Sequence, residues 1–583
     1  MHPLDPLTPS EVAVAANLIK RHNSGESVHF KNITLIEPPK KELRKFLVAE
    51  RNGSPRPPIP ARRASSLYYI RGTADLYLAT VDLGNAKLEQ AEKLDSRYHG
   101  QADMDEVIEC YLYAKDKSHP GSNSYDNPLP FSPIIDYITK ELVAIIDLPL
   151  GADHAVTPDV KYIPRPPREW HHDLQSEPKR TDLKPLTVHQ PLGASFNVDG
   201  HLVTWQKWRF RIGFNWREGM VLHDVTYDGR ELFHRLSLSE MFVPYGDPRT
   251  PYSRKSVFDV GDIGAGVAAN NLALGCDCLG LIKPNAICMH EIDDGIGWKH
   301  TDGATKQVSI VRSRVLVLQT IITVGNYEYI FMWHLDQAAA IHYRIQATGI
   351  LSTVPIAPDV KVPWGTNVNH AVMAPYHQHV FSLRIDPTLD GDNNSFIEED
   401  SVPMTFDDNN PVGVGYITEK RVLSTSGSSK AQPNRVHKII NPSIINKISG
   451  NPVAYSIHSP QKQMLLAHPQ SWHGKRAKFA FQPYWVTTYR DGELFAAGDY
   501  TYQSLPDDIP RGANIPRKGD LAAWAGRNDK VNDEDIVLWH SISLTHNPRP
   551  EDYPVMPCET MMSGKVRLKT LAVGRSFEAI GLN

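Results

Sequence analysis

Long stretches of alternating apolar and polar residues fill the chain beyond residue 190. In Trp208–Trp216 apolar or aromatic side chains occupy alternate positions, and the same pattern runs through Ile341–Thr348. Successive side chains of a strand point to opposite faces, so a period of two is typical of strands with one buried face. Turn residues, including many of the 45 prolines, separate these segments. We therefore expect residues 191–583 to form one large antiparallel β-sandwich.

The beginning of the chain shows a different pattern. Thr8-Pro9-Ser10-Glu11 is a capping box with proline at the first helical position, and apolar residues at helical spacing follow as far as Ile19. Ser66–Ile70 and Leu76–Val81 are short runs of strand-forming residues. Together they predict a small α+β domain over residues 1–93.

Residues 94–190 form a second expected unit, also small and α+β. One helical pattern, Met104–Cys110, stands among proline-rich loops, and Lys115–Pro130 has almost no periodicity, which predicts a loop. The predicted fold class is therefore α+β, with small N-terminal α/β domains followed by a large antiparallel β-sandwich that carries the chemistry.

Composition excludes several classes of function. Sixty-two Lys and Arg against 66 Asp and Glu give a net charge of −4, so a nucleic-acid partner is not expected. The longest apolar run, near Val315–Ile322, is too short to span a membrane, and the first residues lack a signal-peptide core. Five cysteines are too few for a disulfide scaffold. We expect an intracellular protein, cytoplasmic or peroxisomal, although the last residues, Ile580–Asn583, are not a Ser-Lys-Leu signal.

The sequence His377-Gln378-His379 leads into an apolar strand pattern. Side chains at i and i+2 share a face of a strand, so both imidazoles are expected to point into the sandwich. Such a pair is half of a site for copper, zinc, iron or nickel, or else two hydrogen-bonded core histidines. His546 and His540 are the candidates for a third ligand.

Two further segments each allow two interpretations. Asn326-Tyr327-Glu328 could be a bulge that presents Tyr327 to an interior site, or part of an ordinary aromatic strand. The glycines after Asp259 have the spacing G-x-x-G-x-G and lack the βαβ context of a nucleotide-binding loop. Asp259 follows Val257 and Phe258, where apolar surroundings would raise its pKa toward that of a useful base; otherwise it belongs to a glycine-rich turn.

Taken together, these segments form an ordered set. Asn326–Glu328, His377–His379 and Thr545-His546 occur with other recognisable motifs, namely Val243–Gly246, Asp259–Gly261, Gly275–Cys278, His290–Gly295, Leu383–Pro387 and Pro550–Pro557. In this order and spacing, the set resembles the copper-containing amine oxidases over nearly the whole chain, and the fungal branch most closely.

The resemblance implies a homodimeric enzyme that uses oxygen to convert primary amines into aldehydes, releasing ammonia and hydrogen peroxide. Copper would be held by His377, His379 and His546, three imidazoles that suit this ion. Tyr327 would be the precursor of topaquinone, which takes the amine as a Schiff base. The expected roles of the other site residues are general base for Asp259, a hydrogen bond to the quinone for Tyr245 and positioning of the quinone for Asn326.

The resemblance also implies a second, calcium-like site and a disulfide. Asp386, Asp535 and the backbone of Ile536 match the family positions for the ion. The family disulfide would join Cys278 to Cys288, but the intervening loop of nine residues is shorter than usual, which leaves open whether it can close. The unit over residues 94–190 is also shorter than in the family.

Two alternatives remain open at this stage. One is a catalytically impaired relative, a metal-binding β-sandwich inactivated by the shortened second unit. The other is a zinc hydro-lyase or hydrolase in which the same three histidines hold a metal-bound water.

Overall fold

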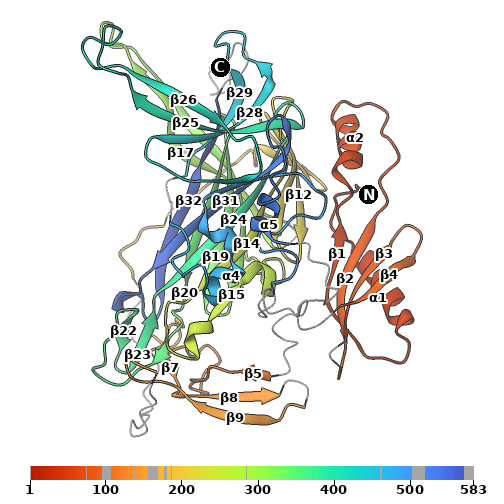
Figure 1. Cartoon of the computed structure of the whole chain (residues 1–583), viewed down its shortest axis with the longest axis vertical. Helices are drawn as coiled ribbons and strands as arrows, with labels where there is room; N and C mark the ends of the chain where they lie inside the picture. The colour runs from red at the N-terminus through yellow and green to blue at the C-terminus, as the bar shows by residue number, and fades with distance from the viewer. Residues whose placement is uncertain are drawn as a thin grey trace.

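The chain is described by a computed structural model in which residues 2–73, 75–94, 107–136, 139–154, 168–175, 180–185, 187–283, 285–459, 463–501 and 519–569 are placed. Figure 1 shows a long β-sandwich with a smaller α+β unit standing beside it. None of the helices within these residues is long and apolar enough to cross a membrane.

The N-terminal unit is a four-stranded antiparallel sheet with two helices. The predicted capping box is confirmed: Thr8 Oγ1 accepts from the Glu11 backbone N–H at 3.2 Å, and the Glu11 carboxylate accepts from the Thr8 N–H at 2.9 Å. The first helix packs Ala15 and Ile19 against the sheet. In chain order the elements are α1 (Pro9–His22), β1 (Val28–Ile36), α2 (Lys40–Arg51), β2 (Arg63–Ile70), β3 (Leu76–Asp82) and β4 (Lys87–Leu94).

A second, smaller region lies below the sandwich in Figure 1. The helix predicted over Met104–Cys110 is wrong where it can be compared, because Val107–Glu109 forms a strand paired with β8; residues 104–106 lie outside the described part. The pairing with β8, together with the strand preference of the β-branched residues Val107 and Ile108, outweighs the helical spacing of the apolar residues. Lys115–Pro130 is the predicted loop except for one short strand. The strands are β5 (Val107–Glu109), β6 (Tyr113–Ala114), β7 (Asn127–Pro128), β8 (Phe131–Asp136) and β9 (Leu142–Asp147).

Twenty strands of the described residues beyond 190 join into one antiparallel system that encloses the main core. They are β10 (Phe196–Asp199), β11 (Leu202–Trp205), β12 (Trp208–Asn215), β13 (Gly219–Tyr227), β14 (Arg230–Pro244), β15 (Ser256–Phe258), β16 (Leu281–Lys283), β17 (Ile287–Thr301), β18 (Val308–Val324), β19 (Tyr327–Asp336), β20 (Ala340–Gly349), β24 (His377–Pro387), β25 (Asn393–Pro403), β26 (Tyr416–Val422), β27 (Gly427–Ser429), β28 (Arg435–Ile445), β29 (Pro452–Ile457), β30 (Tyr484–Thr488), β31 (Glu534–His546) and β32 (Met556–Lys569). The antiparallel sandwich predicted from the alternation is therefore confirmed.

Short elements complete this part of the chain. A three-stranded sheet is formed by β21 (Val354–Pro355), β22 (Gly365–Asn369) and β23 (Val372–Pro375), which leads directly into β24. The helical turns are α4 (Trp472–Arg476), α5 (Leu521–Ala525), the 3₁₀ turns η2 (Tyr252–Arg254), η4 (Lys478–Phe481) and η6 (Pro550–Asp552), and the π-helical turn η3 (Asp259–Ile263).

The alternating segments bury the predicted faces, with one informative exception. On β20, Ile341, Tyr343 and Ile345 are buried while the residues between them are partly exposed. On β12 the opposite face is covered as well, because Arg211 pairs with Glu50 of α2 at 2.9 Å. The N-terminal unit therefore contacts the sandwich through ion pairs, on a face that the sequence pattern assigns to solvent.

Phe381 is a test of the core that supports the candidate site. It is fully buried on β24, two residues beyond His379, between β14 and β31. We expect Phe381→Ala to cost about 3–5 kcal/mol of stability because it leaves a cavity. Calorimetric unfolding should show a clear fall in Tm, whereas Leu183→Ala, at a position that is 72% exposed, should leave Tm nearly unchanged. Equal Tm values for the two variants would contradict this assignment of the core.

Candidate metal and quinone site

Three histidines meet where β24 pairs with β31. The antiparallel register sets His377 directly opposite His546, and His379 lies two residues further along the same face of β24. One ligating atom from each imidazole lies within 4.8 Å of the other two. His377 and His379 are buried, and His546 is partly exposed. The structure thus brings together the predicted ligand set.

Hydrogen bonds identify the nitrogen atoms that face the centre. The carbonyl oxygen of Pro375 lies 2.9 Å from His377 Nδ1 and can accept its proton, which leaves Nε2 to point inward, 3.3 Å from His546 Nδ1. His379 Nδ1 lies 2.9 Å from the Tyr329 hydroxyl, so its Nε2 is also available to a ligand. Asp552 contacts the outer nitrogen of His546 at 3.5 Å. Such outer contacts hold ligating imidazoles in position.

Burial keeps two of these imidazoles neutral. It lowers the pKa of His379 to about 3, and burial together with the nearby His379 and His546 moves the pKa of His377 well below its ordinary value. Metal ions bind the neutral imidazole, so the site is ready for a divalent ion near neutral pH. The donor set fits copper, and by its chemistry alone it would also fit zinc.

His540, the other candidate for the third ligand, lies elsewhere. It is opposite Leu383 in the β24–β31 register, its Nδ1 lies 3.0 Å from the Pro483 carbonyl oxygen, and its ring stacks on Tyr484 with centroids 4.6 Å apart. His540 is a buried core histidine. The sequence alone left this choice open because only the strand register separates the two candidates.

Tyr327 is the first residue of β19, directly after the tight turn Gly325-Asn326 that joins β18 to β19. A hairpin turn presents it, and the β18–β19 register runs to Tyr327 without a bulge. Its hydroxyl lies 2.6 Å from His377 Nε2 and its side chain is buried. Asn326 Nδ2 donates to the Ile350 carbonyl oxygen at 2.6 Å, which fixes the turn.

Asp259 and Tyr245 complete the arrangement. The Tyr245 ring stacks on His377 with centroids 5.0 Å apart. Asp259 begins η3 and is 2% exposed; burial, together with the charges of Asp262 and Glu240, raises its pKa well above the ordinary value. The raised pKa expected from its apolar neighbours is therefore found, with two carboxylates as additional causes.

A buried charge cluster behind Asp259 was missed by the sequence reasoning. Glu240 on β14 accepts from the Gly261 N–H at 2.9 Å and from Arg217 at 3.1 Å, and burial raises its pKa to about 7. A Cβ atom at position 261 would come within 3.0 Å of Glu240 and Thr501, so the close approach of these side chains favours glycine at this position. A lone glutamate inside the apolar run of β14 was the available signal.

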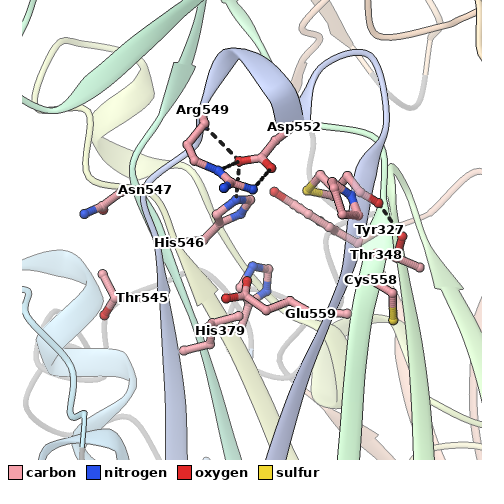
Figure 2. A pocket seen from close by; sticks show the side chains of 14 residues that line it. Tyr327, Thr348, His379, Thr545, His546, Asn547, Arg549, Asp552, Cys558 and Glu559 are labelled. Carbon is pink, nitrogen blue, oxygen red and sulfur yellow. Dashed lines mark hydrogen bonds and ion pairs between the residues drawn. The ribbon is translucent and has the colours of Figure 1, made fainter.

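A cavity of about 420 Å³ opens beside the histidines. Figure 2 shows Tyr327, His379 and His546 around it, with Asp552 and Arg549 at its edge. Arg549 donates to Asp552 through its backbone N–H and its guanidinium, both at 2.9 Å, which holds the carboxylate beside His546. Asp259 does not line this cavity, so the cavity gives access to the histidine side of Tyr327.

The structure also places the residues of the expected calcium-like site and of the expected disulfide. The residues proposed for the calcium-like site come together, with Ile536 buried beside Asp535 on β31, but the Nζ of Lys40 lies 2.7 Å from Asp386 and 2.5 Å from Asp535. The disulfide between Cys278 and Cys288 is formed, with 5.8 Å between the Cα atoms. The short loop can close because β16 turns back and pairs with β17.

Comparisons with known proteins agree along the chain. The family model described as copper amine oxidase, enzyme domain, matches residues 197–569, and the N2-domain model of the same family matches residues 2–94. Copper amine oxidase 1 of Aspergillus niger is 38% identical over 96% of this chain and 93% of its own length. The peroxisomal primary amine oxidase of Pichia angusta is 33% identical over 94% of this chain and 88% of its own. The crystal structure of a copper-containing benzylamine oxidase from Hansenula polymorpha superposes with a TM-score of 0.91 at 41% identity, covering 97% of each chain.

The choice between His546 and His540 can be tested by metal analysis. Because two imidazoles hold the ion poorly, we expect His546→Ala to lower the affinity for copper by roughly tenfold or more. His540→Ala is the matched control and should bind one copper per chain as the wild type does. Metal content after dialysis and the copper EPR spectrum are the measurements. Full copper occupancy in His546→Ala would remove this residue from the ligand set.

Proposed function

The chain belongs to the copper amine oxidase family, and from that premise we propose that it oxidises primary amines with a quinone made from its own Tyr327. The products are the aldehyde, ammonia and hydrogen peroxide, and dioxygen is the electron acceptor. One observation carries the proposal: the Tyr327 hydroxyl lies 2.6 Å from His377 Nε2, at the meeting point of the three histidines.

The residues present suit both cofactors. His377, His379 and His546 would hold the copper ion, which with dioxygen would supply the oxidation of the Tyr327 phenol to topaquinone, and the quinone would supply an electron acceptor for the amine. Tyr327 enters as a neutral phenol, since burial, with Tyr245 beside it, raises its pKa well above the ordinary value. The closeness of its hydroxyl to a ligand nitrogen supports this role.

Asp259 is proposed as the general base that removes a proton from the α-carbon of the amine. Its burial and raised pKa are typical of carboxylates used in proton transfer near neutral pH. Tyr245, stacked on His377, is proposed to hold the quinone oxygen by a hydrogen bond. Asn326 is proposed to position the quinone, since its side chain anchors the turn that precedes Tyr327.

The two alternative functions are not favoured. A zinc hydrolase would have no use for a buried tyrosine against the histidines, and the named relatives are amine oxidases. An impaired relative would be expected to have lost part of the site, whereas the three histidines, Tyr327, Tyr245 and Asp259 are all present, and all of them except the partly exposed His546 are buried. The shortened region over residues 94–190 has not removed these side chains.

We also propose a homodimer and an intracellular, cytoplasmic or peroxisomal location. The hairpins β17–β18 and β25–β26 extend from the sandwich (Figure 1). They carry exposed apolar side chains, which include Ile296, Ile310, Phe406, Val412 and Val414. Exposed apolar surface on projecting strands suits an interface between copies of the chain. Two of the relatives are named as peroxisomal enzymes, from Pichia angusta and Nicotiana tabacum.

Tyr327→Phe tests the quinone. Conversion needs the phenol oxygen, so the variant should bind copper at wild-type stoichiometry but develop no visible absorbance, no reaction with phenylhydrazine and no amine oxidation. Tyr343→Phe is the control, because this tyrosine is also buried in the core but is not one of the proposed site residues. A hydrazine-reactive chromophore in Tyr327→Phe would show that another residue forms the cofactor.

Asp259→Asn tests the base. Loss of the carboxylate should lower kcat/KM by roughly 10²–10⁴-fold, with copper binding and the hydrazine reaction retained. In the wild type the ionised form is the active one, and its pKa is raised, so kcat/KM should fall as the pH drops through that pKa. Glu240→Gln removes a neighbouring negative charge that helps to raise this pKa, and should move the acid limb to lower pH. Wild-type turnover in Asp259→Asn would exclude it as the base.

A further inference from the structure

Lys40 joins the N-terminal unit to the two strands that carry the metal ligands. It is the first residue of α2, which lies in the N-terminal unit at the side of the sandwich in Figure 1. Its Nζ lies 2.7 Å from Asp386 Oδ1 on β24 and 2.5 Å from Asp535 Oδ1 on β31. The Lys40 side chain is 4% exposed and that of Asp386 is fully buried. This is a buried ion pair between two parts of the chain that are far apart in sequence.

The Lys40 ammonium group has three partners, two carboxylates and one aromatic ring. Two protons are accepted by the carboxylates, and the ring of Tyr489 lies 4.3 Å from Nζ as a cation–π partner. The position of Lys40 at the start of α2 also indicates that its charge is paired. A cation at a helix N-terminus opposes the helix dipole, so Lys40 is favourable there only with negative partners. Asp491 adds one by accepting from the Lys40 backbone N–H at 3.0 Å.

These contacts do not fit a calcium ion at the same place. Calcium takes six to eight oxygen ligands at about 2.3–2.6 Å. The carboxylates of Asp386 and Asp535 would have to be among these ligands, but their oxygens already lie 2.7 and 2.5 Å from the Lys40 Nζ, which occupies the position of the ion. Cationic side chains already accompany both carboxylates, since Arg384 lies 3.3 Å from the second oxygen of Asp386. A divalent ion would therefore have to enter beside two positive charges, at a carboxylate of Asp386 that is fully buried.

We propose that the Lys40 ammonium takes the place of the calcium-like ion, and that this internal cation fastens α2 to β24 and β31. The attachment point is on the same two strands as the metal ligands, because His377 and His379 begin β24 and His546 ends β31. The proposal concerns the cation between Asp386 and Asp535 and does not depend on the quinone or on amine oxidation.

Calcium titration of the full-length protein, followed by isothermal calorimetry and by Tm, tests the proposal. Wild type should show no saturable heat and no Tm shift from calcium chloride relative to sodium chloride at equal ionic strength. Lys40→Ala should have a lower Tm without calcium, because the buried carboxylate of Asp386 and the partly exposed carboxylate of Asp535 lose their shared partner. It should also bind calcium at least about tenfold more tightly than wild type and recover Tm when calcium is added. Lys41→Ala, at the exposed neighbouring position, is the control and should behave as wild type.

Two further variants make the result specific. Adding Asp386→Asn to Lys40→Ala should abolish the gained calcium binding, which assigns it to this site. Lys40→Met keeps the length of the apolar stem and serves if the alanine variant does not fold. Stoichiometric calcium binding by wild type that Asp386→Asn abolishes would overturn the proposal. So would a Lys40 variant that folds with unchanged Tm or gains no calcium binding.

Discussion

The antiparallel pairing of β24 with β31 is the constraint on which the site depends. It places His377 opposite His546, and it turns His379 and Phe381 toward the same interior. Because side chains alternate along a strand, a shift of one residue in this register would move His546 to the other face and dismantle the ligand set. The long strands on either side, and the core that they enclose, fix this register.

Burial then determines how the site residues behave. The same exclusion of water that keeps His377 and His379 neutral raises the pKa of Asp259, Glu240 and Tyr327. Burying so many titratable groups opposes folding, and the large apolar core offsets that cost. Ion pairs from Arg217 to Glu240 and from Lys40 to Asp386 neutralise part of the buried charge. Buried titratable groups that oppose folding are expected where a fold supports chemistry.

The sequence predicted what periodicity and local chemistry control. Alternation gave the strands of the sandwich, a capping box gave α1, and the spacing of His377 and His379 placed both on one face. It was wrong about Val107–Glu109, where pairing with β8 outweighs local helical spacing. The third histidine, the closed disulfide and the Lys40 contact could not be settled from local pattern, because each depends on which distant segments come to lie side by side. The contact to Lys40 spans 346 residues of sequence.

Formation of the quinone from Tyr327 is tested most directly by the mass of the peptide that contains this residue, after aerobic copper loading of protein produced without metal. We expect a gain of two oxygen atoms and a loss of two hydrogen atoms at Tyr327, as for topaquinone. No change is expected when copper or oxygen is withheld. An unmodified tyrosine mass at position 327 in folded, copper-replete, aerated protein would show that Tyr327 is not the cofactor precursor.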